Sequence, residues 1–312
     1  DSASRGLGDV YKRQSMIFAH YPKFVIIMIY YAYMNIKLNF LIVFIFFTQT
    51  IYSEENFTFS AWNKPDIEVF YYLPEEVNQD TKVLFVIHGA SRTAERYLNH
   101  WKSLTFDKNI IVIAPKFSED SFPSFNTLVI DSKTEGYLLN PDNYIGDSIS
   151  IIFNFFKSKF DLNDNTYRMY GHSGGSQFVH RYLLFGVDAR AEKVVMANAG
   201  WYTFLNDVNY PYGIKDVPVT QERLEWFLSL RAAVLLGDKD VNPNADNLRN
   251  NSKAKIQGRH RYERGLAYFR DNIAVAEKLE VPFRWKLEVV EGVGHQNSLM
   301  TTHAANFLLS DL

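Results

Sequence analysis

The sequence predicts a single α/β domain over residues 54–312, with a mostly parallel central sheet covered by helices on both faces. From Asp66 onward, short β-branched and aromatic runs alternate with longer helical patterns, which is typical of parallel strands joined by helices. No repeat, low-complexity stretch or Gly/Ser-rich linker after residue 54 divides this region. With 312 residues, 47% of them hydrophobic, the chain can bury a large core.

The overall composition excludes several classes of function. A formal net charge of -2 provides no basic field for nucleic acid, so we expect no nucleic-acid partner. The absence of cysteine excludes disulfides, thiolate metal sites and a cysteine nucleophile. Stability must therefore come from packing.

The first 53 residues are interpreted separately from the domain. Residues 1–15 have no apolar periodicity and resemble a non-native leader, such as a translated cloning adaptor. Residues 16–53 form a hydrophobic export segment. Within it, residues 34–53 have the layout of a secretory signal peptide, in which Lys37 precedes an apolar run and cleavage is expected near Ser53.

A membrane anchor is the alternative interpretation of this region. Residues 24–47 are long enough to span a bilayer, but Asn35, Lys37 and Asn39 interrupt the apolar run. We therefore expect a secreted or periplasmic protein. Contact with a membrane is expected only through this segment, if it is retained as an anchor.

Seven strands are expected in the domain, each a short run rich in β-branched or aromatic residues. They cover residues 67–72, 82–87, 110–114, 167–170, 193–197, 232–236 and 285–290. Apolar residues also recur every three or four positions over residues 145–160 and 262–276. This period predicts two helices that turn one face toward the core.

The least regular stretch of the domain is residues 202–229, between two expected strands. Its aromatic residues could wall a substrate pocket as a small cap or lid, or could pack as part of an ordinary connection. We expect Trp201 and Tyr202 to line a pocket, because they directly follow a strand's C-terminal end, where open parallel sheets form their sites.

The strongest chemical signal is the run YRMYGHSGG at residues 167–175. A strand leads directly into a G-x-S-x-G turn, which would expose Ser173 where a histidine can activate its hydroxyl. Gly171 and Gly175 lack Cβ atoms, so the strand and the following helix can approach closely. Ser173 is the candidate nucleophile, and His172 is expected beside it in the substrate pocket.

Two backbone N–H groups are expected to stabilise an oxyanion next to Ser173. Gly174 would supply one, because it directly follows the nucleophile. The other would come from His88-Gly89-Ala90-Ser91, after the strand at 82–87, with Ala90 preferred and Ser91 as the alternative.

A carboxylate and a histidine follow the serine in the required chain order. The turn Gly237-Asp238-Lys239-Asp240 offers two aspartates after the strand at 232–236. His295 follows the last strand, on a glycine-containing loop that can carry its imidazole back over the strand ends. A neutral imidazole can accept the serine proton and later deliver it to the leaving group.

Together these motifs resemble those of the α/β-hydrolase superfamily, and within it the secreted esterases related to polyhydroxybutyrate depolymerases and feruloyl esterases. The resemblance rests on HGAS at 88–91, GHSGG at 171–175, GDKD at 237–240 and GVGH at 292–295. It implies the α/β-hydrolase fold, and it selects Asp240, three positions after Gly237, over Asp238 as the acid. Unlike many secreted relatives, the chain has no cysteine pair and nothing resembling a polymer-binding module.

The resemblance implies a serine esterase that cleaves carboxylic esters through an acyl-enzyme, with Ser173, His295 and Asp240 as its triad and with no metal or organic cofactor. A small or oligomeric ester is at least as suitable a substrate as a solid polyester. The same triad would serve a thioesterase, a peptidase or an acyltransferase. A non-catalytic binding protein with the hydrolase fold is the alternative of another class.

Overall fold

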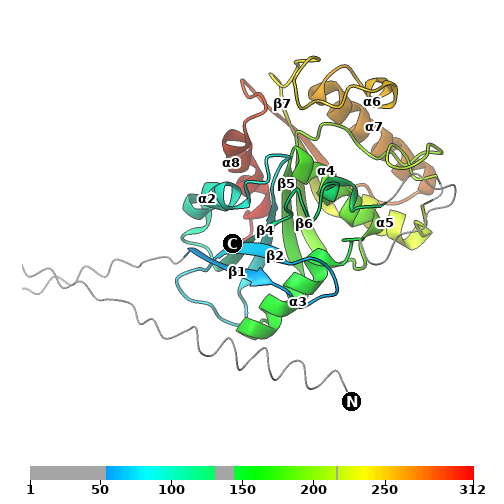
Figure 1. Cartoon of the computed structure of the whole chain (residues 1–312). Helices are drawn as coiled ribbons and strands as arrows, with labels where there is room; N and C mark the ends of the chain where they lie inside the picture. The colour runs from blue at the N-terminus through cyan, green and yellow to red at the C-terminus, as the bar shows by residue number, and fades with distance from the viewer. Residues whose placement is uncertain (1–53, 131–143, 216) are drawn as a thin grey trace, which may run out of the picture. The chain divides into compact units, whose positions relative to one another are not determined.

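The structure is a computed structural model that describes residues 54–130, 144–215 and 217–312 (Figure 1). Four expectations lie outside these residues: the leader at 1–15, the export segment at 16–53, the signal peptide at 34–53 and the alternative anchor at 24–47. Within the described ranges, no helix has both the length and the hydropathy needed to cross a bilayer.

One sheet of eight strands, in the order β1-β2-β4-β3-β5-β6-β7-β8, forms the centre of the described chain. β1 and β4 each pair with β2 in antiparallel fashion, and all other pairs are parallel. The strands are β1 (Glu54–Phe59), β2 (Ile67–Tyr72), β3 (Lys82–Ile87), β4 (Ile110–Lys116), β5 (Tyr167–His172), β6 (Ala191–Ala197), β7 (Arg231–Gly237) and β8 (Lys286–Val290). The seven expected strands are all present, whereas β1 was not predicted.

Helices cover both faces of this sheet, as predicted (Figure 1). On one face lie α2 (Ala94–Thr105) and α8 (Asn297–Leu308). The other face carries α3 (Ser148–Phe160), α4 (Gly174–Phe185), α5 (Gln221–Ser229) and α7 (Arg261–Leu279). A short helix, α6 (Ser252–Ile256), precedes α7. The two predicted helical stripes correspond to α3 and α7.

Alternation along the central strands divides the core into two parts. In β3, Val83, Phe85 and Ile87 face the α3–α4 side, while Leu84 and Val86 face the α2–α8 side. All five are at most 1% exposed. Since successive side chains of a strand point to opposite faces, a continuous apolar run is what a strand with helices on both sides requires.

In its described residues, the irregular stretch expected over 202–229 consists of turns and loops up to residue 220, followed by α5. Tyr202, Tyr210 and Phe227 are buried in the core on the α4–α7 side, and Tyr212 packs against Trp201. Of the two interpretations given above, this burial favours a packed connection over a separate lid.

The sheet register brings the motif-bearing loops to one edge. Ile87 pairs with Gly171, His172 with Ala197, and Gly237 with Val290, so strands β3, β5, β6, β7 and β8 end side by side. Between β3 and β5 the order of the strands in the sheet changes direction. β4, which follows β3 in the chain, lies on one side of this point, and β6, which follows β5, lies on the other. Open parallel sheets form their sites at such a reversal.

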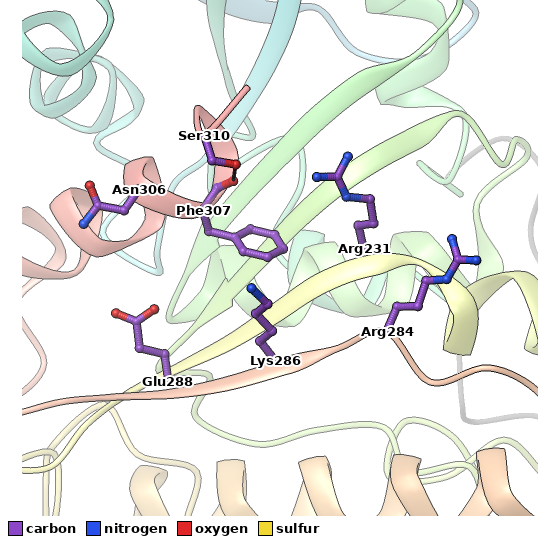
Figure 2. A pocket seen from close by; sticks show the side chains of 7 residues that line it. All are labelled: Arg231, Arg284, Lys286, Glu288, Asn306, Phe307 and Ser310. Atoms are coloured by element: carbon purple, nitrogen blue, oxygen red, sulfur yellow. Dashed lines mark hydrogen bonds between the residues drawn. The ribbon is translucent and has the colours of Figure 1, made fainter. Parts of the chain in front are cut away.

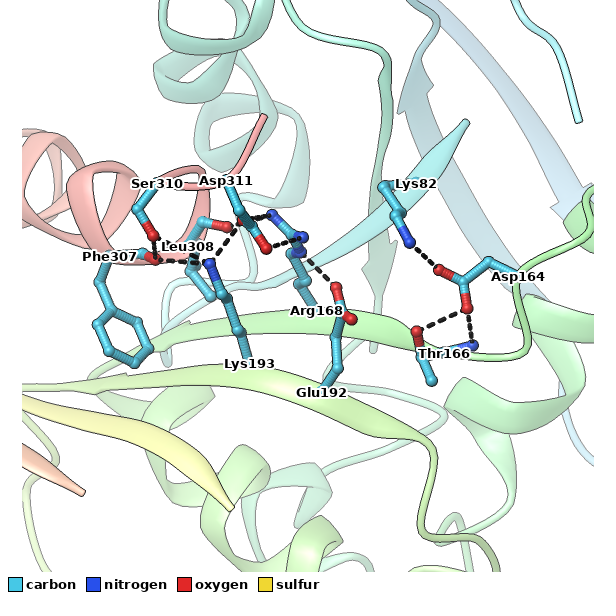
Figure 3. Close-up of polar contacts among 10 residues, drawn as sticks. All are labelled: Lys82, Asp164, Thr166, Arg168, Glu192, Lys193, Phe307, Leu308, Ser310 and Asp311. Carbon is cyan, nitrogen blue, oxygen red and sulfur yellow. Dashed lines mark hydrogen bonds and ion pairs between the residues drawn. The ribbon is translucent and has the colours of Figure 1, made fainter. Parts of the chain in front are cut away.

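A charged network closes the opposite edge, where β3, β5 and β6 begin (Figure 3). Asp311, beyond the end of α8, accepts hydrogen bonds from Lys193 at 2.6 Å and from Arg168 at 3.1 Å. Both cations have side chains that are 1% exposed. Arg168 also donates to Glu192, and Lys82 pairs with Asp164. These contacts fasten the C-terminus to the sheet.

Candidate active site

Ser173 lies on the sharp turn between β5 and α4. Its φ of 58° and ψ of -117° are rare for a residue with a side chain, and its N–H donates to the Ala197 carbonyl at 2.9 Å. A Cβ on Gly171 would lie 2.3 Å from the Gly175 oxygen, and a Cβ on Gly175 would lie 2.1 Å from the Ile87 oxygen. Only glycine at both positions permits β5, α4 and β3 to meet this closely.

Ser173, His295 and Asp240 form a continuous chain of hydrogen bonds. Nε2 of His295 lies 2.9 Å from Oγ of Ser173, and Nδ1 of His295 lies 2.6 Å from Oδ2 of Asp240. Asp240 is buried, while the other two side chains are half-buried. Because an ionised carboxylate only accepts, the proton on Nδ1 points to Asp240, and Nε2 is left to accept the serine proton. This arrangement can generate a serine nucleophile.

The two aspartates of the 237–240 turn have different surroundings. Besides His295, Asp240 contacts the buried guanidinium of Arg261, whose Nη1 lies 3.3 Å from Oδ1. Asp238 instead pairs with exposed Lys239 at 3.2 Å. The structure therefore brings Asp240, rather than the alternative Asp238, to His295.

Asn198, just after β6, connects the loops of the acid and the histidine. Its φ of 47° places it in the left-handed region. Its Oδ1 accepts from the N–H of Gly237 at 2.9 Å, and its Nδ2 donates to the Gly294 carbonyl at 3.1 Å. Sequence analysis missed Asn198 and Arg261, because neither belongs to a motif with a fixed spacing to the serine.

The two expected oxyanion donors lie next to each other. A Cβ on Gly174 would stand 3.1 Å from the Ala90 nitrogen. The N–H of Ala90 donates to no other described residue. The N–H of Gly174 opens α4, where the first amides of a helix have no intrahelical acceptor. Ser91, the alternative donor residue, is exposed, and its Oγ lies 3.1 Å from Oγ1 of Thr93.

A buried histidine fixes the shape of the loop that carries Ala90. Nδ1 of His88 donates to the Gly89 carbonyl at 2.8 Å, and Nε2 accepts from the N–H of Phe117 at 3.0 Å. Burial lowers the pKa of His88 to about 4. The imidazole is therefore neutral at neutral pH, as this pair of hydrogen bonds requires.

The three residues expected in the substrate pocket are all buried, with exposed fractions of 2% for His172, 3% for Trp201 and 0% for Tyr202. The His172 ring packs 4.7 Å from that of His295, and Tyr202 stacks on Tyr268 at 4.3 Å between ring centres. The burial of all three side chains argues against an open pocket wall at these positions.

A hollow of about 290 Å³ lies at the other edge of the sheet, beside the first residues of β7 and β8 (Figure 2). Its lining consists of Arg231, Arg284, Lys286, Glu288, Asn306, Phe307 and Ser310. The lining contains Ser310 but no histidine that could activate its hydroxyl, so the hollow is not a second candidate for a serine-hydrolase active site. Residues 54–130, 144–215 and 217–312 contain no group of three His, Asp or Glu side chains that could hold a metal ion.

Comparisons with known proteins identify relatives by structure. No protein-family model and no curated protein sequence matches the chain. Poly(aspartic acid) hydrolase-1 from Sphingomonas sp. KT-1, whose structure has been solved, is 33% identical to this chain in sequence. The two structures superpose with a TM-score of 0.76, and the match covers 82% of this chain and 98% of that one.

Two further solved structures are similar. LpqC, a poly(3-hydroxybutyrate) depolymerase from Bordetella parapertussis, is 25% identical with a TM-score of 0.76, and the match covers 84% of this chain and 90% of that one. A ferulic acid esterase shares the fold alone, at 14% identity and a TM-score of 0.52, over 82% of this chain and 96% of that one.

Proposed function

The chain belongs to the α/β-hydrolase superfamily of hydrolytic enzymes, and from this premise we propose that it is a serine esterase that cleaves carboxylic esters through an acyl-enzyme. The observation that carries the proposal is the hydrogen-bonded chain from Ser173 through His295 to Asp240, at 2.9 and 2.6 Å. The substrates are small, oligomeric or polymeric esters, and the groups that act on them are the three triad side chains, two backbone N–H groups and a water molecule.

In the first half of the reaction, His295 takes the proton from Ser173 as Oγ attacks the ester carbonyl. The N–H groups of Ala90 and Gly174 stabilise the negative charge that develops on the carbonyl oxygen. Asp240 holds the imidazole in the tautomer that accepts this proton and stabilises the imidazolium. The histidine then protonates the departing alcohol. In the second half, water activated by the same imidazole releases the acid and frees the serine.

Amide hydrolysis is the second candidate function. A specific observation favours it: the relative that is 33% identical is a poly(aspartic acid) hydrolase, and the bonds of that polymer are amides. An amide nitrogen must be protonated before it leaves, so the position of His295 next to Ser173 suits this reaction as well. Parallel assays on an ester and on the matching amide distinguish the two proposals.

The test of the proposed function is hydrolysis of p-nitrophenyl acetate and butyrate by the wild-type protein and by Ser173→Ala. Removing the nucleophile should reduce kcat by at least about a thousandfold while the protein still folds. A fluorophosphonate probe should label the wild-type protein and not the variant, because only an activated serine reacts. Wild-type turnover by Ser173→Ala would refute the assignment, and an unlabelled, inactive wild-type protein would favour the non-catalytic alternative.

We also propose that the domain is exported, with residues 34–53 as a cleaved signal peptide. The size and the N-terminal sequence of the protein recovered from the periplasm or the medium test this. A product that begins near residue 54 supports cleavage. A membrane-bound product that keeps residues 24–47 supports the anchor instead.

A further inference from the structure

A group of arginines surrounds Trp201, close to the proposed triad. The guanidinium of Arg181 lies 4.0 Å from the centre of the Trp201 ring, and that of Arg249 lies 4.7 Å from it. Arg261 and Arg264, from the first turn of α7, adjoin them. These five residues are called the Trp201 cluster below.

The Trp201 cluster carries uncompensated positive charge. Arg181, Arg249 and Arg264 have no carboxylate partner within the described part of the chain, and Arg261 shares Asp240 with His295. Arg181 and Arg264 donate only to neutral oxygens, including the carbonyls of Asn126 and Gly200. Burying cations without anions is costly, so a bound anion would be stabilised here.

Donor groups in the cluster remain free. Nη2 of Arg181 and Nη2 of Arg264 are fully buried and have no hydrogen-bond partner among the described residues. Arg249 is exposed, and only its Nε is engaged, by a 2.6 Å bond to the hydroxyl of Tyr212. Its two Nη groups make no hydrogen bond to any described residue, so the planar fork of this exposed side chain is available to a carboxylate.

The cluster is continuous with the proposed catalytic site. Gly200, the neighbour of Trp201, lies between the two: a Cβ built on it would be 3.1 Å from Nε2 of Gln177 and 4.0 Å from Nε of Arg261. Gln177 lies one helical turn after Ser173, to whose carbonyl its N–H donates. Arg261 contacts Asp240. Gln177, Gly200 and Arg261 therefore connect the cluster to Ser173 and Asp240 through direct contacts.

We propose that Arg249, the exposed member of the otherwise buried Trp201 cluster, binds a carboxylate of the substrate that several atoms separate from the scissile bond. Arg249 is the exposed contact, and Trp201 is the platform that holds its guanidinium. The substrate class is thus an ester that carries an additional carboxylate, as in an acid-terminated or polyanionic chain. This inference rests on the hydrolytic function proposed for Ser173 and goes beyond it by naming a specificity-determining residue.

The experiment compares two series of p-nitrophenyl esters with the same numbers of carbon atoms. One series consists of monoesters of dicarboxylic acids, from adipate to sebacate, and the other of the corresponding monocarboxylic esters. The quantity measured is the ratio of kcat/KM for the charged ester to that for the neutral ester, for wild-type protein, Arg249→Gln, Arg249→Lys and Arg231→Gln. Arg231 is the matched control, because it is an exposed arginine in the hollow at the other edge of the sheet.

We expect the wild-type ratio to peak at one chain length and to fall as NaCl rises from 0.05 to 0.5 M. Arg249→Gln should lower that peak ratio about tenfold, Arg249→Lys should retain part of it, and Arg231→Gln should not change it. Equal ratios for the wild type and Arg249→Gln at every length would overturn the inference, as would an equal loss in Arg231→Gln. A wild-type protein that hydrolyses neither series would instead refute the proposed function, and the inference with it.

Discussion

At the residue scale, the role of triad acid has two candidates on one turn, Asp240 and Asp238. Asp240 lies 2.6 Å from Nδ1 of His295, whereas Asp238, two positions earlier, pairs with Lys239 at 3.2 Å. An amide in place of the Asp240 carboxylate would present a donor to Nδ1 and favour the wrong tautomer. We therefore expect Asp240→Asn to lower kcat/KM for p-nitrophenyl butyrate by about 10³–10⁴-fold.

The matched variant is Asp238→Asn, which changes the same chemical group on the same turn. It should lower kcat/KM by less than about tenfold, because Asp238 does not contact the imidazole. Steady-state kinetics of both variants, with thermal unfolding to show that they fold, make the comparison. Equal losses in the two proteins would mean that the carboxylates act together on the turn and not through His295.

A functional residue could be predicted from the sequence only where a short motif around it indicates its role. Ser173 and His295 each lie in a short motif after a strand, so chain order predicted them, whereas the choice of Asp240 over Asp238 came from the resemblance to the family. Asn198 and Arg261 act through contacts to other loops, and such contacts leave no spacing in the sequence. Burial of the rings at 172, 201 and 202 depends on what covers them, which the sequence does not encode locally.

At the element scale, the junction of β5, α4 and β3 tolerates no side chain at Gly175. A Cβ there would lie 2.1 Å from the Ile87 oxygen, which is backbone and cannot move aside alone. Gly175→Ala should therefore push α4 away from the sheet and destabilise the protein by about 2 kcal/mol or more. Urea unfolding measures this, and esterase activity should fall because Ser173 moves with α4.

Ser176→Ala is the control for this junction. Ser176 is the next residue of α4, it is fully buried, and its Oγ has no hydrogen-bond partner in the described part of the chain. Removing that oxygen should change the free energy of unfolding by less than about 1 kcal/mol. If the two variants were equally stable, close backbone approach would not be what requires glycine at position 175.

The network that fastens α8 gives a second prediction at this scale (Figure 3). Burial opposes ionisation of Asp311, but the hydrogen bond from Lys193 and the charge of Arg168 outweigh it and lower its pKa. Asp311→Asn would leave these two buried cations with less compensation, but the Asp311 side chain is 45% exposed and screened by solvent, so the fold should lose only about 1 kcal/mol of stability. Asp107→Asn, which removes an exposed carboxylate 3.6 Å from Lys108, should cost less than about 0.5 kcal/mol in the same unfolding assay.

The elements differ in how far the sequence predicts them. The interior strands are recognisable because both of their faces are buried, which gives continuous apolar runs such as VLFVI at 83–87. β1 (Glu54–Phe59) was missed because it is an edge strand that begins with two glutamates and pairs on one side only. Its pairing with β2 is a tertiary contact, so only the structure reveals it.

At the scale of the whole molecule, three buried histidines make stability depend on pH. Burial lowers the pKa of His88 to about 4 and places those of His172 and His180 well below the usual value near 6.5. His180 repeats the arrangement of His88: Nδ1 donates to the Ser176 carbonyl at 2.9 Å, and Nε2 accepts from the N–H of Thr203 at 3.1 Å. Protonating His88 or His180 would place a proton on Nε2, which would then face a backbone N–H that can only donate.

The direction of the effect follows from proton uptake. Between about pH 6.5 and 4, the unfolded chain binds protons on these histidines and the folded protein does not, so stability falls as pH falls. We expect a loss of about 1 kcal/mol per histidine between pH 7 and pH 5.5, measured by urea unfolding. Carboxylates whose pKa is lowered in the folded state, such as Asp164, stay ionised in both states over this interval and do not contribute.

His180→Gln separates this mechanism from a general acid effect. An amide can donate to the Ser176 carbonyl and accept from the Thr203 N–H, but it does not titrate. The variant is expected to be less stable at pH 7 and to lose about 1 kcal/mol less than the wild type on going to pH 5.5, because one proton-binding group is gone from the unfolded chain. An unchanged pH dependence in His180→Gln would show that the acid sensitivity of the fold has its origin in other groups.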